Sequence, residues 1–397
     1  MLNIVVLRDI MKQKEVEKMK IIKVAAEGIN LFKDRIDIDF YAEKRVLADN
    51  SEMVSNLFGR FFTNNVISVV GINAAGKTSL LKFISFVFNY MNGMSINTIS
   101  EREVFTDSRE INIEVIFYTE EKGLCKLSSK IVRKHINKIE EKYIVEEEKL
   151  FVKDTSKVKS KKDLISFDDS TLHTERDEES VYLQEDVSIV SAITKKDRLA
   201  VRSLLRFTNI NMMALIGDFP HQLLKFLDPT IEYIRFKKDT DEAIIKFYDR
   251  KPIHLTNPIL FEKYLSSGTI KGITVFISAM LAFKDGGYLI IDELENHFNR
   301  EIVATLLRFF MDQSVNKKGA TLVFSTHYSE LLDEIERNDN IYIVRNRSGI
   351  TAQKLCVALS RNDIKKSDAF KSDYLDGTVP IYDAYIDLKR VLKNQSF

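Results

Sequence analysis

The sequence predicts an α/β protein whose sheet is largely parallel, and two observations carry this prediction. After Gly268, apolar segments of helical and strand character alternate along the chain. Such alternation is typical of parallel sheets, because each helix crosses back over the sheet before the next strand begins. Further upstream, the apolar run 66–70 leads into the glycine-containing loop 71–76, and residues 80–90 then show helical spacing.

Apolar periodicity predicts the other elements. Alternation over residues 20–41 indicates a strand pair, and residues 111–152 indicate an antiparallel strand meander. Residues 187–265 show mainly helical spacing, so we expect an inserted helical lobe, with a short strand pair within residues 230–250. The expected order after Gly268 is helix 273–283, strand 288–291, helix 300–310, strand 320–325, helix 329–337 and strand 340–345.

Composition bounds the class of protein. The 397 residues are 45% hydrophobic and 29% charged, which excludes disorder throughout. The 59 basic and 58 acidic side chains exclude a protein that is basic all over, but they allow local basic strips. Residues 153–163 are rich in lysine and residues 168–179 in acids. We interpret this stretch as a solvated loop, with a docking surface for a charged partner as the alternative.

The expected division has four segments. Residues 1–150 form the first part of a nucleotide-binding head, residues 151–264 the charged loop and helical lobe, residues 265–346 the second part of the head, and residues 347–397 a tail. Two cysteines are too few for a disulfide framework. The sequence shows no signal-peptide pattern and no apolar stretch of membrane-spanning length, so we expect a cytoplasmic protein.

The loop from Gly71 to Thr78, Gly-Ile-Asn-Ala-Ala-Gly-Lys-Thr, fits the phosphate-loop pattern in the required strand–loop–helix setting. Its glycines let backbone N–H groups turn inward around a phosphate, and the helix that follows directs its positive end at the same anion. Lys77 supplies a cation to the β- and γ-phosphates, and Thr78 offers a hydroxyl to Mg²⁺. Asn73, Ala74, Ala75, Gly76 and Ser79 complete the expected nucleotide-binding set.

Two acids follow a buried strand further along the chain. Residues 288–291 are apolar, and Asp292 and Glu293 come directly after them. Because ligands bind at the carboxyl ends of parallel strands, we expect Asp292 to complete the Mg²⁺ shell opposite Thr78. Glu293 is placed to accept a proton from the attacking water or to orient it. Helix capping is the structural alternative for both acids.

Two further segments are candidates for contact with the γ-phosphate. His327 follows the apolar run 321–324, and the neighbouring strand would carry the two carboxylates. Ser266, Ser267 and Gly268 open a helix, where free N–H groups favour anions. Serine and glycine are also ordinary helix caps, so this second signal is weak by itself.

Taken in order, these elements resemble the head of an ABC-type ATPase. Gly71–Thr78 is similar to the Walker A motif, residues 265–269 to a degenerate form of the signature Leu-Ser-Gly-Gly-Gln, residues 290–293 to Walker B with its catalytic glutamate, and His327 to the switch histidine. Residues 292–297 and 324–327, with Asn73 and two alanines in the loop, resemble the stand-alone ATPases of the overcoming-lysogenization-defect group, which are related to SMC and RecF heads. Residues 374–380 resemble the tail of such ATPases in abortive-infection operons.

The resemblance implies an ATPase that uses ATP and Mg²⁺ and acts in trans. Two heads would close face to face on ATP, with Ser266 and Gly268 of one subunit completing the site of the other, and hydrolysis assisted by Glu293 would reopen them. We therefore expect a switch subunit of a bacterial anti-phage, abortive-infection system. It would form a homodimer or higher oligomer and control a separate effector, such as a nuclease or toxin.

Three departures from the family pattern are visible. Ser267 and Thr269 replace a glycine and the glutamine of the signature, no glutamine suits the Q-loop position, and no Toprim nuclease follows residue 346. The main alternative is a RecF/SMC-like DNA-binding repair ATPase, which would carry a basic strip near residues 130–134 or 195–206. A transporter ATPase subunit is a weaker alternative.

Overall fold

The computed structural model describes residues 19–135, 141–177, 183–193, 198–208, 219–237, 242–296, 298–359, 364–379 and 382–394. Its central sheet has the order β10 (Val201–Ser203), β14 (Tyr288–Ile291), β15 (Thr321–Thr326), β5 (Val66–Val70), β16 (Ile341–Asn346) and β17 (Ile350–Lys354). The first five strands are parallel, and β17 pairs antiparallel with β16. This confirms a mixed α/β fold with a mostly parallel sheet.

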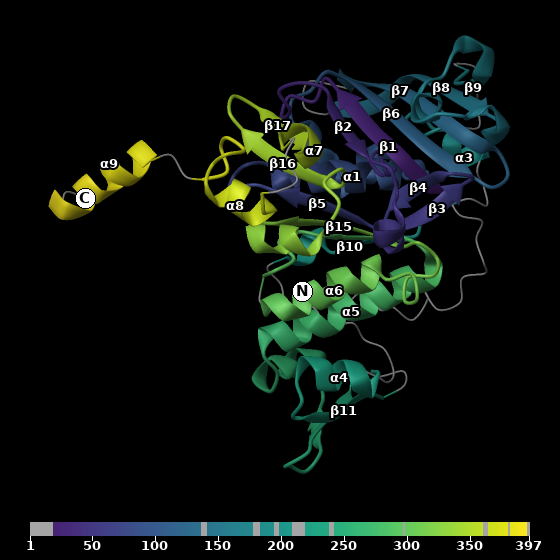
Figure 1. Cartoon of the computed structure of the whole chain (residues 1–397). Coiled ribbons are helices and arrows are strands. Elements are labelled where there is room, and N and C mark those ends of the chain that lie inside the picture. The colour runs from purple at the N-terminus through teal and green to yellow at the C-terminus, as the bar shows by residue number, and fades with distance from the viewer. Residues whose placement is uncertain are drawn as a thin grey trace.

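A second sheet contains the predicted strand pair and meander. Its antiparallel order is β2 (Ile36–Asp39), β1 (Lys20–Glu27), β6 (Glu110–Thr119), β7 (Gly123–His135), β8 (Glu141–Lys153) and β9 (Leu172–Glu175). A separate hairpin joins β3 (Val54–Phe58) to β4 (Phe61–Asn64). In Figure 1 the second sheet covers the upper part of the molecule, and the central sheet lies below it.

The two sheets enclose α1 (Lys77–Met91), which explains why this helix is buried on almost every side. In β5, Ile67 and Val69 belong to the core shared with α1, whereas Val66 and Val70 belong to the core on the opposite face. This second core contains α5 (Ser267–Asp285) and α6 (Arg300–Met311), seen below the sheet in Figure 1. Both faces of the central strands are therefore covered, as their continuous apolar sequences require.

The prediction of an inserted helical lobe is wrong for the residues that the structure describes between 219 and 265. They form the short helix α4 (His221–Leu227), the antiparallel strands β11 (Ile231–Phe236), β12 (Ala243–Phe247) and β13 (Ile253–Leu255), and a 3₁₀ helix at Pro258–Lys263. Both β11 and β12 are rich in isoleucine and aromatic residues, which favours strands, and β12 alternates between buried and half-exposed positions. The predicted strand pair is confirmed. Met212 and Leu215, which had suggested helix, lie outside the described residues.

Two other segments differ from expectation. The predicted helix 329–337 is a 3₁₀ helix at Ser329–Glu334, and beyond it Arg337 pairs with Asp339 and donates to the Lys44 carbonyl oxygen. The charged stretch 153–177 contains α2 (Lys161–Ile165), capped by Ser160, and strand β9 on the edge of the second sheet. It is therefore partly ordered structure rather than loop alone.

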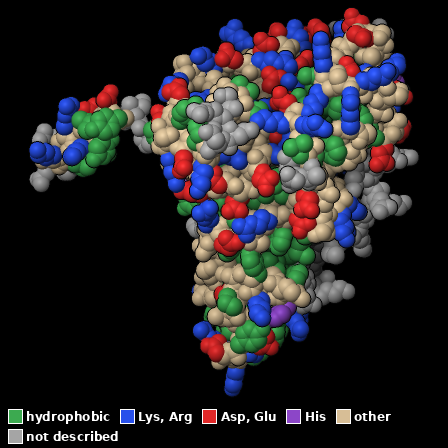
Figure 2. All heavy atoms as spheres, viewed as in Figure 1, with side chains coloured by type: hydrophobic (Ala, Val, Ile, Leu, Met, Phe, Trp, Pro, Cys, Tyr) green, Lys and Arg blue, Asp and Glu red, His purple; other side chains and the backbone are tan. Residues whose placement is uncertain are grey.

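The tail after residue 346 contributes several elements. Strand β17 extends the central sheet, and α7 (Leu355–Ala358) and α8 (Lys366–Lys371) add Leu355, Ala369 and Phe370 to the core below it. Helix α9 (Tyr382–Asn394) stands apart from the rest of the chain in Figure 1, and an apolar stripe is visible on it in Figure 2. Helix α3 (Val190–Ile193) lies near the meander. Within the described residues, no helix combines the length and apolar character needed to cross a bilayer.

Candidate nucleotide site

The predicted phosphate loop joins β5 to α1 at the carboxyl edge of the central sheet. Gly71 approaches the backbone so closely that a Cβ atom would lie 2.5 Å from the Val344 carbonyl oxygen. Gly76 has a φ of 100°, and a Cβ atom there would meet Ile350. Both positions therefore require glycine, for space at the first and for space and backbone conformation at the second.

The other residues predicted to bind nucleotide differ in exposure and backbone conformation. Asn73 and Ala74 are exposed, whereas Ala75 is buried against the core. Ala74 adopts a left-handed φ of 62°, which curls the loop between the two glycines. Ser79 is half-buried in the first turn of α1.

Lys77 is folded back over its own loop. Its Nζ donates to the carbonyl oxygens of Gly71 at 2.9 Å and Ile72 at 3.0 Å, and the residue is 6% exposed. Burial lowers the pKa of Lys77, and the nearby carboxylates of Asp292, Glu293 and Glu295 oppose this shift. The Lys77 ammonium thus lies inside the loop, near three carboxylates, and its hydrogen bonds go to two carbonyl oxygens. A bound phosphate group would supply stronger acceptors than these carbonyl oxygens.

The structure brings Thr78 and Asp292 together across the sheet. The Thr78 hydroxyl donates to Asp292 Oδ2 at 2.6 Å, and the Ser325 hydroxyl donates to Asp292 Oδ1. A hydroxyl beside a carboxylate is the oxygen donor set that Mg²⁺ prefers, so these two side chains fit the predicted metal site. The pairing spans β5 and β14, which are separated by β15, the strand that carries Ser325.

Glu293 occupies a strained turn directly after β14. Its φ of 49° is left-handed, and its backbone N–H donates to Ser325 Oγ at 2.8 Å. The Asn296 N–H donates to the Glu293 carbonyl oxygen at 2.8 Å and fixes the turn from the other side. Ser325 therefore sets the relative positions of both predicted Walker B acids.

His327 follows β15 at the same edge and is held by Glu295. The His327 backbone N–H donates to Glu295 Oε1 at 2.8 Å, and His327 Nδ1 lies 3.3 Å from the same oxygen. The Glu295 side chain is 2% exposed, and its Oε2 has no hydrogen-bond partner among the described residues. A buried carboxylate in this position orients the imidazole ring.

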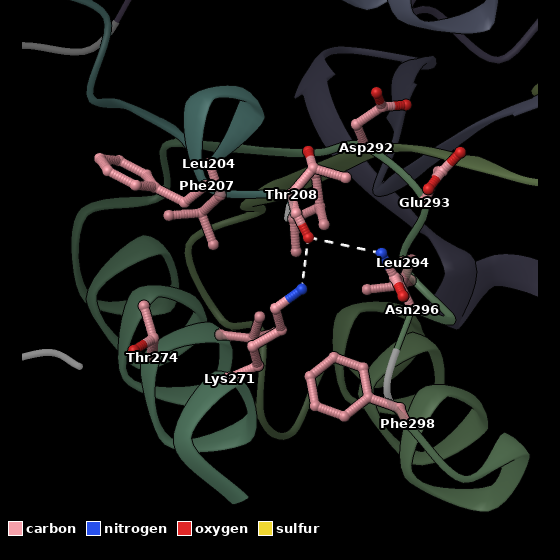
Figure 3. A pocket seen from close by; sticks show the side chains of 12 residues that line it. Leu204, Phe207, Thr208, Lys271, Thr274, Asp292, Glu293, Leu294, Asn296 and Phe298 are labelled. Atoms are coloured by element: carbon pink, nitrogen blue, oxygen red, sulfur yellow. Dashed lines mark hydrogen bonds between the residues drawn. The ribbon is translucent and has the colours of Figure 1, made fainter. Parts of the chain in front are cut away.

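A small pocket lies beside the two acids, between them and α5. It holds about 40 Å³, and in Figure 3 both Lys271 and Asn296 point at the Thr208 carbonyl oxygen. Burial lowers the pKa of Lys271, and Glu293 opposes this shift. In Figure 3 the Asp292 and Glu293 carboxylates point away from this ammonium.

The predicted signature residues lie at the start of α5, and the hydrogen bonds seen for Ser266 are separate from those that join Thr78, Asp292 and Ser325. Ser266 is the N-cap of α5, and its Oγ accepts from the Thr269 N–H at 3.0 Å. Ser267 and Gly268 are half-exposed in the first turn. The hydrogen bonds seen for Ser266 in the described part of the chain stay within this helix start, which is the capping role that the sequence left open.

Sequence reasoning missed Ser325, Glu295 and Lys271. Ser325 and Glu295 stand next to predicted site residues, and that proximity was the available signal. Their partners depend on loop conformation, which has no periodic pattern in sequence. Lys271 is separated from the acids by a helix and a strand, and no motif marked it.

Comparison with known proteins identifies the family to which the chain belongs. A search of curated proteins found no match. A family model described as "AAA domain, putative AbiEii toxin, Type IV TA system" matches residues 66–333, which begin at β5 and end beyond His327. These residues include the predicted phosphate loop, Asp292, Glu293 and the strands that position them. The chain therefore belongs to this AAA-domain family of P-loop ATPases.

Proposed function

We propose that the protein is the ATP-hydrolysing switch subunit of a bacterial abortive-infection complex, which closes head to head on ATP and controls a separate nuclease or toxin. The main support is the connected set Thr78, Asp292, Ser325 and Glu293 at one sheet edge. The toxin–antitoxin description of its family supports the defence setting.

In this proposal the chain's own residues bind and orient the substrate. The loop N–H groups and Lys77 hold the phosphates, and the ammonium exchanges the Gly71 and Ile72 carbonyls for phosphate oxygens. Thr78 and Asp292 would hold Mg²⁺, which supplies charge neutralisation on the phosphates. Glu293 accepts a proton from the attacking water, and His327, oriented by Glu295, contacts the γ-phosphate.

The trans-acting part of the proposal concerns the start of α5. The Ser266 hydroxyl caps its helix, and the first-turn N–H groups beyond it favour an anion. In a closed homodimer this helix start would face the γ-phosphate bound by the other subunit. Nucleotide state would then determine whether the effector is held or released.

The alternative of a RecF/SMC-like DNA clamp predicted two basic strips, and ion pairs engage some of their cations. Lys130 pairs with Glu110 and Glu146, and Arg133 pairs with Asp107 and Glu141. In the second strip, Arg202 pairs with Asp285, and Lys195 lies outside the described residues. These contacts weaken the case for DNA binding at the first strip, whereas Arg198 and Arg206 of the second strip are exposed.

Co-purification and phage challenge test the proposal together. We expect the wild-type chain and Glu293→Gln to retain an effector protein in an ATP-dependent manner, and Lys77→Ala to lose that dependence. Protection of cells should require both the ATPase and the co-purified protein. Full protection by this chain expressed alone would contradict the switch role.

A further inference from the structure

Two adjoining hollows far from the nucleotide site are lined by an excess of cations. One holds about 580 Å³ and the other about 770 Å³, and Lys44 and Arg45 line both. We propose that this surface, here called the basic trough, binds the sugar–phosphate backbone of single-stranded nucleic acid. Its cationic side chains are Lys44, Arg45, Arg60, Lys161, Arg300, Arg337, Lys365 and Lys366.

The basic trough lies at the amino edge of the central sheet, opposite the phosphate loop. Residues 337–339 directly precede β16, and the Asn340 side chain donates to the carbonyl oxygen of Val66, the first residue of β5. Gly71 follows the other end of β5. Five strand residues separate the two edges by about 16 Å. A ligand in the trough would therefore leave the nucleotide site open.

Several of the cations are available to a ligand. Lys44, Arg45 and Lys365 are exposed, and their side chains form no ion pair within the described residues. The Arg60 guanidinium lies 6.0 Å from the centre of the Phe61 ring, an arrangement that leaves its N–H groups free to bind an anion. Charges without internal partners give the trough its positive potential.

Two of the three acids that line the trough accept hydrogen bonds, and Asp339 is also paired with a cation. Asp339 accepts from Arg337 Nε at 3.0 Å and from the Lys44 N–H at 2.7 Å. Asp333 accepts from the Ser367 hydroxyl at 2.5 Å. Glu336 is the third lining acid, and eight cations face these three carboxylates.

Arg337 gives the wall of the trough a buried cation. Its side chain is 2% exposed, and its Nη1 has no hydrogen-bond partner among the described residues. The positive charge is fixed by Asp339 and the Lys44 carbonyl oxygen rather than free to fold away. Because Arg337 is buried and paired with Asp339, it anchors the wall of the trough, and the exposed Lys44 and Arg45 are the cations that can reach a phosphate.

The shape and lining select a nucleic-acid strand over other anions. The cations extend through two joined hollows, whereas a single small anion needs donors that converge on one point. Tyr41 and Phe61 are each 6% exposed, and Phe62 is half-buried. Phe62 beside Arg60 offers one stacking surface, so recognition would depend on the backbone and little on base identity. An acidic peptide is the competing occupant.

Fluorescence anisotropy with the full chain and a labelled oligothymidylate of about 20 nucleotides tests the proposal. We expect binding at about 50 mM salt that weakens strongly by about 200 mM. Lys44→Glu with Arg45→Glu should lower affinity at least about tenfold and reduce the salt slope by about 1.4 for two lost phosphate contacts. ATP hydrolysis should be unchanged, because both residues lie outside the nucleotide site.

The matched control reverses two exposed lysines away from the trough, Lys225→Glu in α4 with Lys263→Glu at the end of the 3₁₀ helix Pro258–Lys263, and should bind like wild type. Lys44→Gln with Arg45→Gln repeats the test without charge reversal. Equal affinity of both trough variants and wild type would overturn the proposal, as would absence of wild-type binding at about 50 mM salt. Tighter binding of duplex DNA, or displacement by polyglutamate as effective as by unlabelled oligothymidylate, would also overturn it. Each of these outcomes is independent of ATP turnover.

Discussion

Two residues of the predicted nucleotide site have a strained backbone. Ala74 and Glu293 both adopt left-handed φ values without being glycine, at 62° and 49°. Such conformations cost about 1–3 kcal/mol each and persist where surrounding contacts determine them. For Glu293 those contacts are the hydrogen bonds to Ser325 Oγ and from the Asn296 N–H. The strain thus positions a carboxylate at the sheet edge.

Replacement of Lys77 tests the phosphate loop. We expect Lys77→Ala to abolish nucleotide binding, because the phosphates lose their cation, as measured by equilibrium binding of a fluorescent ATP analogue. Lys82→Ala is the matched control, since Lys82 lies on the same helix and pairs with the exposed Glu103. Unchanged affinity in Lys77→Ala would refute the assignment of this loop.

Replacement of Glu295 tests how His327 is held. Glu295→Gln keeps the acceptor for the His327 N–H but removes the charge beside Nδ1, and we expect about a tenfold fall in kcat with ATP affinity retained. Steady-state phosphate release measures it. Glu295→Asp should recover part of the rate if charge is the important property. A fall in ATP affinity with normal kcat would indicate a different role.

Site residues divide into those that sequence could and could not predict. Gly71, Gly76, Lys77 and Thr78 were predictable because a phosphate loop requires particular residue types at fixed spacing. Ser325 was not, because its role depends on β15 lying between β14, which Asp292 follows, and β5, which leads into the loop before Thr78. Strand order in a sheet is a tertiary property that one motif does not encode.

At the scale of elements, α1 connects the phosphate loop to the second sheet. Near the end of the helix, Tyr90 donates to the buried Glu148 of β8 at 2.6 Å. Glu148 also accepts from the Ser129 and Ser188 hydroxyls and from the Ile189 N–H, each at 2.8 Å. One carboxylate therefore joins the nucleotide-binding helix to the meander and to the segment before α3.

Glu148 is accordingly expected to be important for stability. Glu148→Ala leaves several buried donors without an acceptor and should lower the free energy of unfolding by about 3 kcal/mol. Urea unfolding followed by circular dichroism measures the change. Glu146→Ala, on the partly exposed side of the same strand, should change stability by less than about 0.5 kcal/mol. Equal effects of the two substitutions would contradict the network's importance.

Elements with strong periodicity were predicted well. The central strands bury both faces, so their continuous apolar runs identified them, and α5 and α6 appeared through helical spacing. The segment 219–265 was misjudged because leucines at wide spacing suggested helix, whereas β11 and β12 span only six and five residues, and only β12 alternates. Short strands and 3₁₀ turns give weaker sequence signals than long helices.

At the scale of the whole molecule, the two edges of the central sheet have different characters. The carboxyl edge carries a compact set of carboxylates, hydroxyls and Lys77 around the phosphate loop. The amino edge carries the basic trough. Figure 2 shows basic and acidic side chains interspersed over the upper body, which agrees with the net charge of +1. The near balance of charge over the whole chain therefore does not exclude a local excess of cations such as the basic trough.

The most direct test of the ATPase switch is Glu293→Gln, with phosphate release measured beside sedimentation in ATP. We predict turnover lowered by about a hundredfold or more, retained ATP binding, and a dimer that forms with ATP and disperses with ADP. Glu301→Gln, an exposed glutamate on α6, should hydrolyse ATP at the wild-type rate and serves as control. Wild-type turnover by Glu293→Gln would contradict the catalytic assignment, and a monomer with bound ATP would contradict closure of two heads.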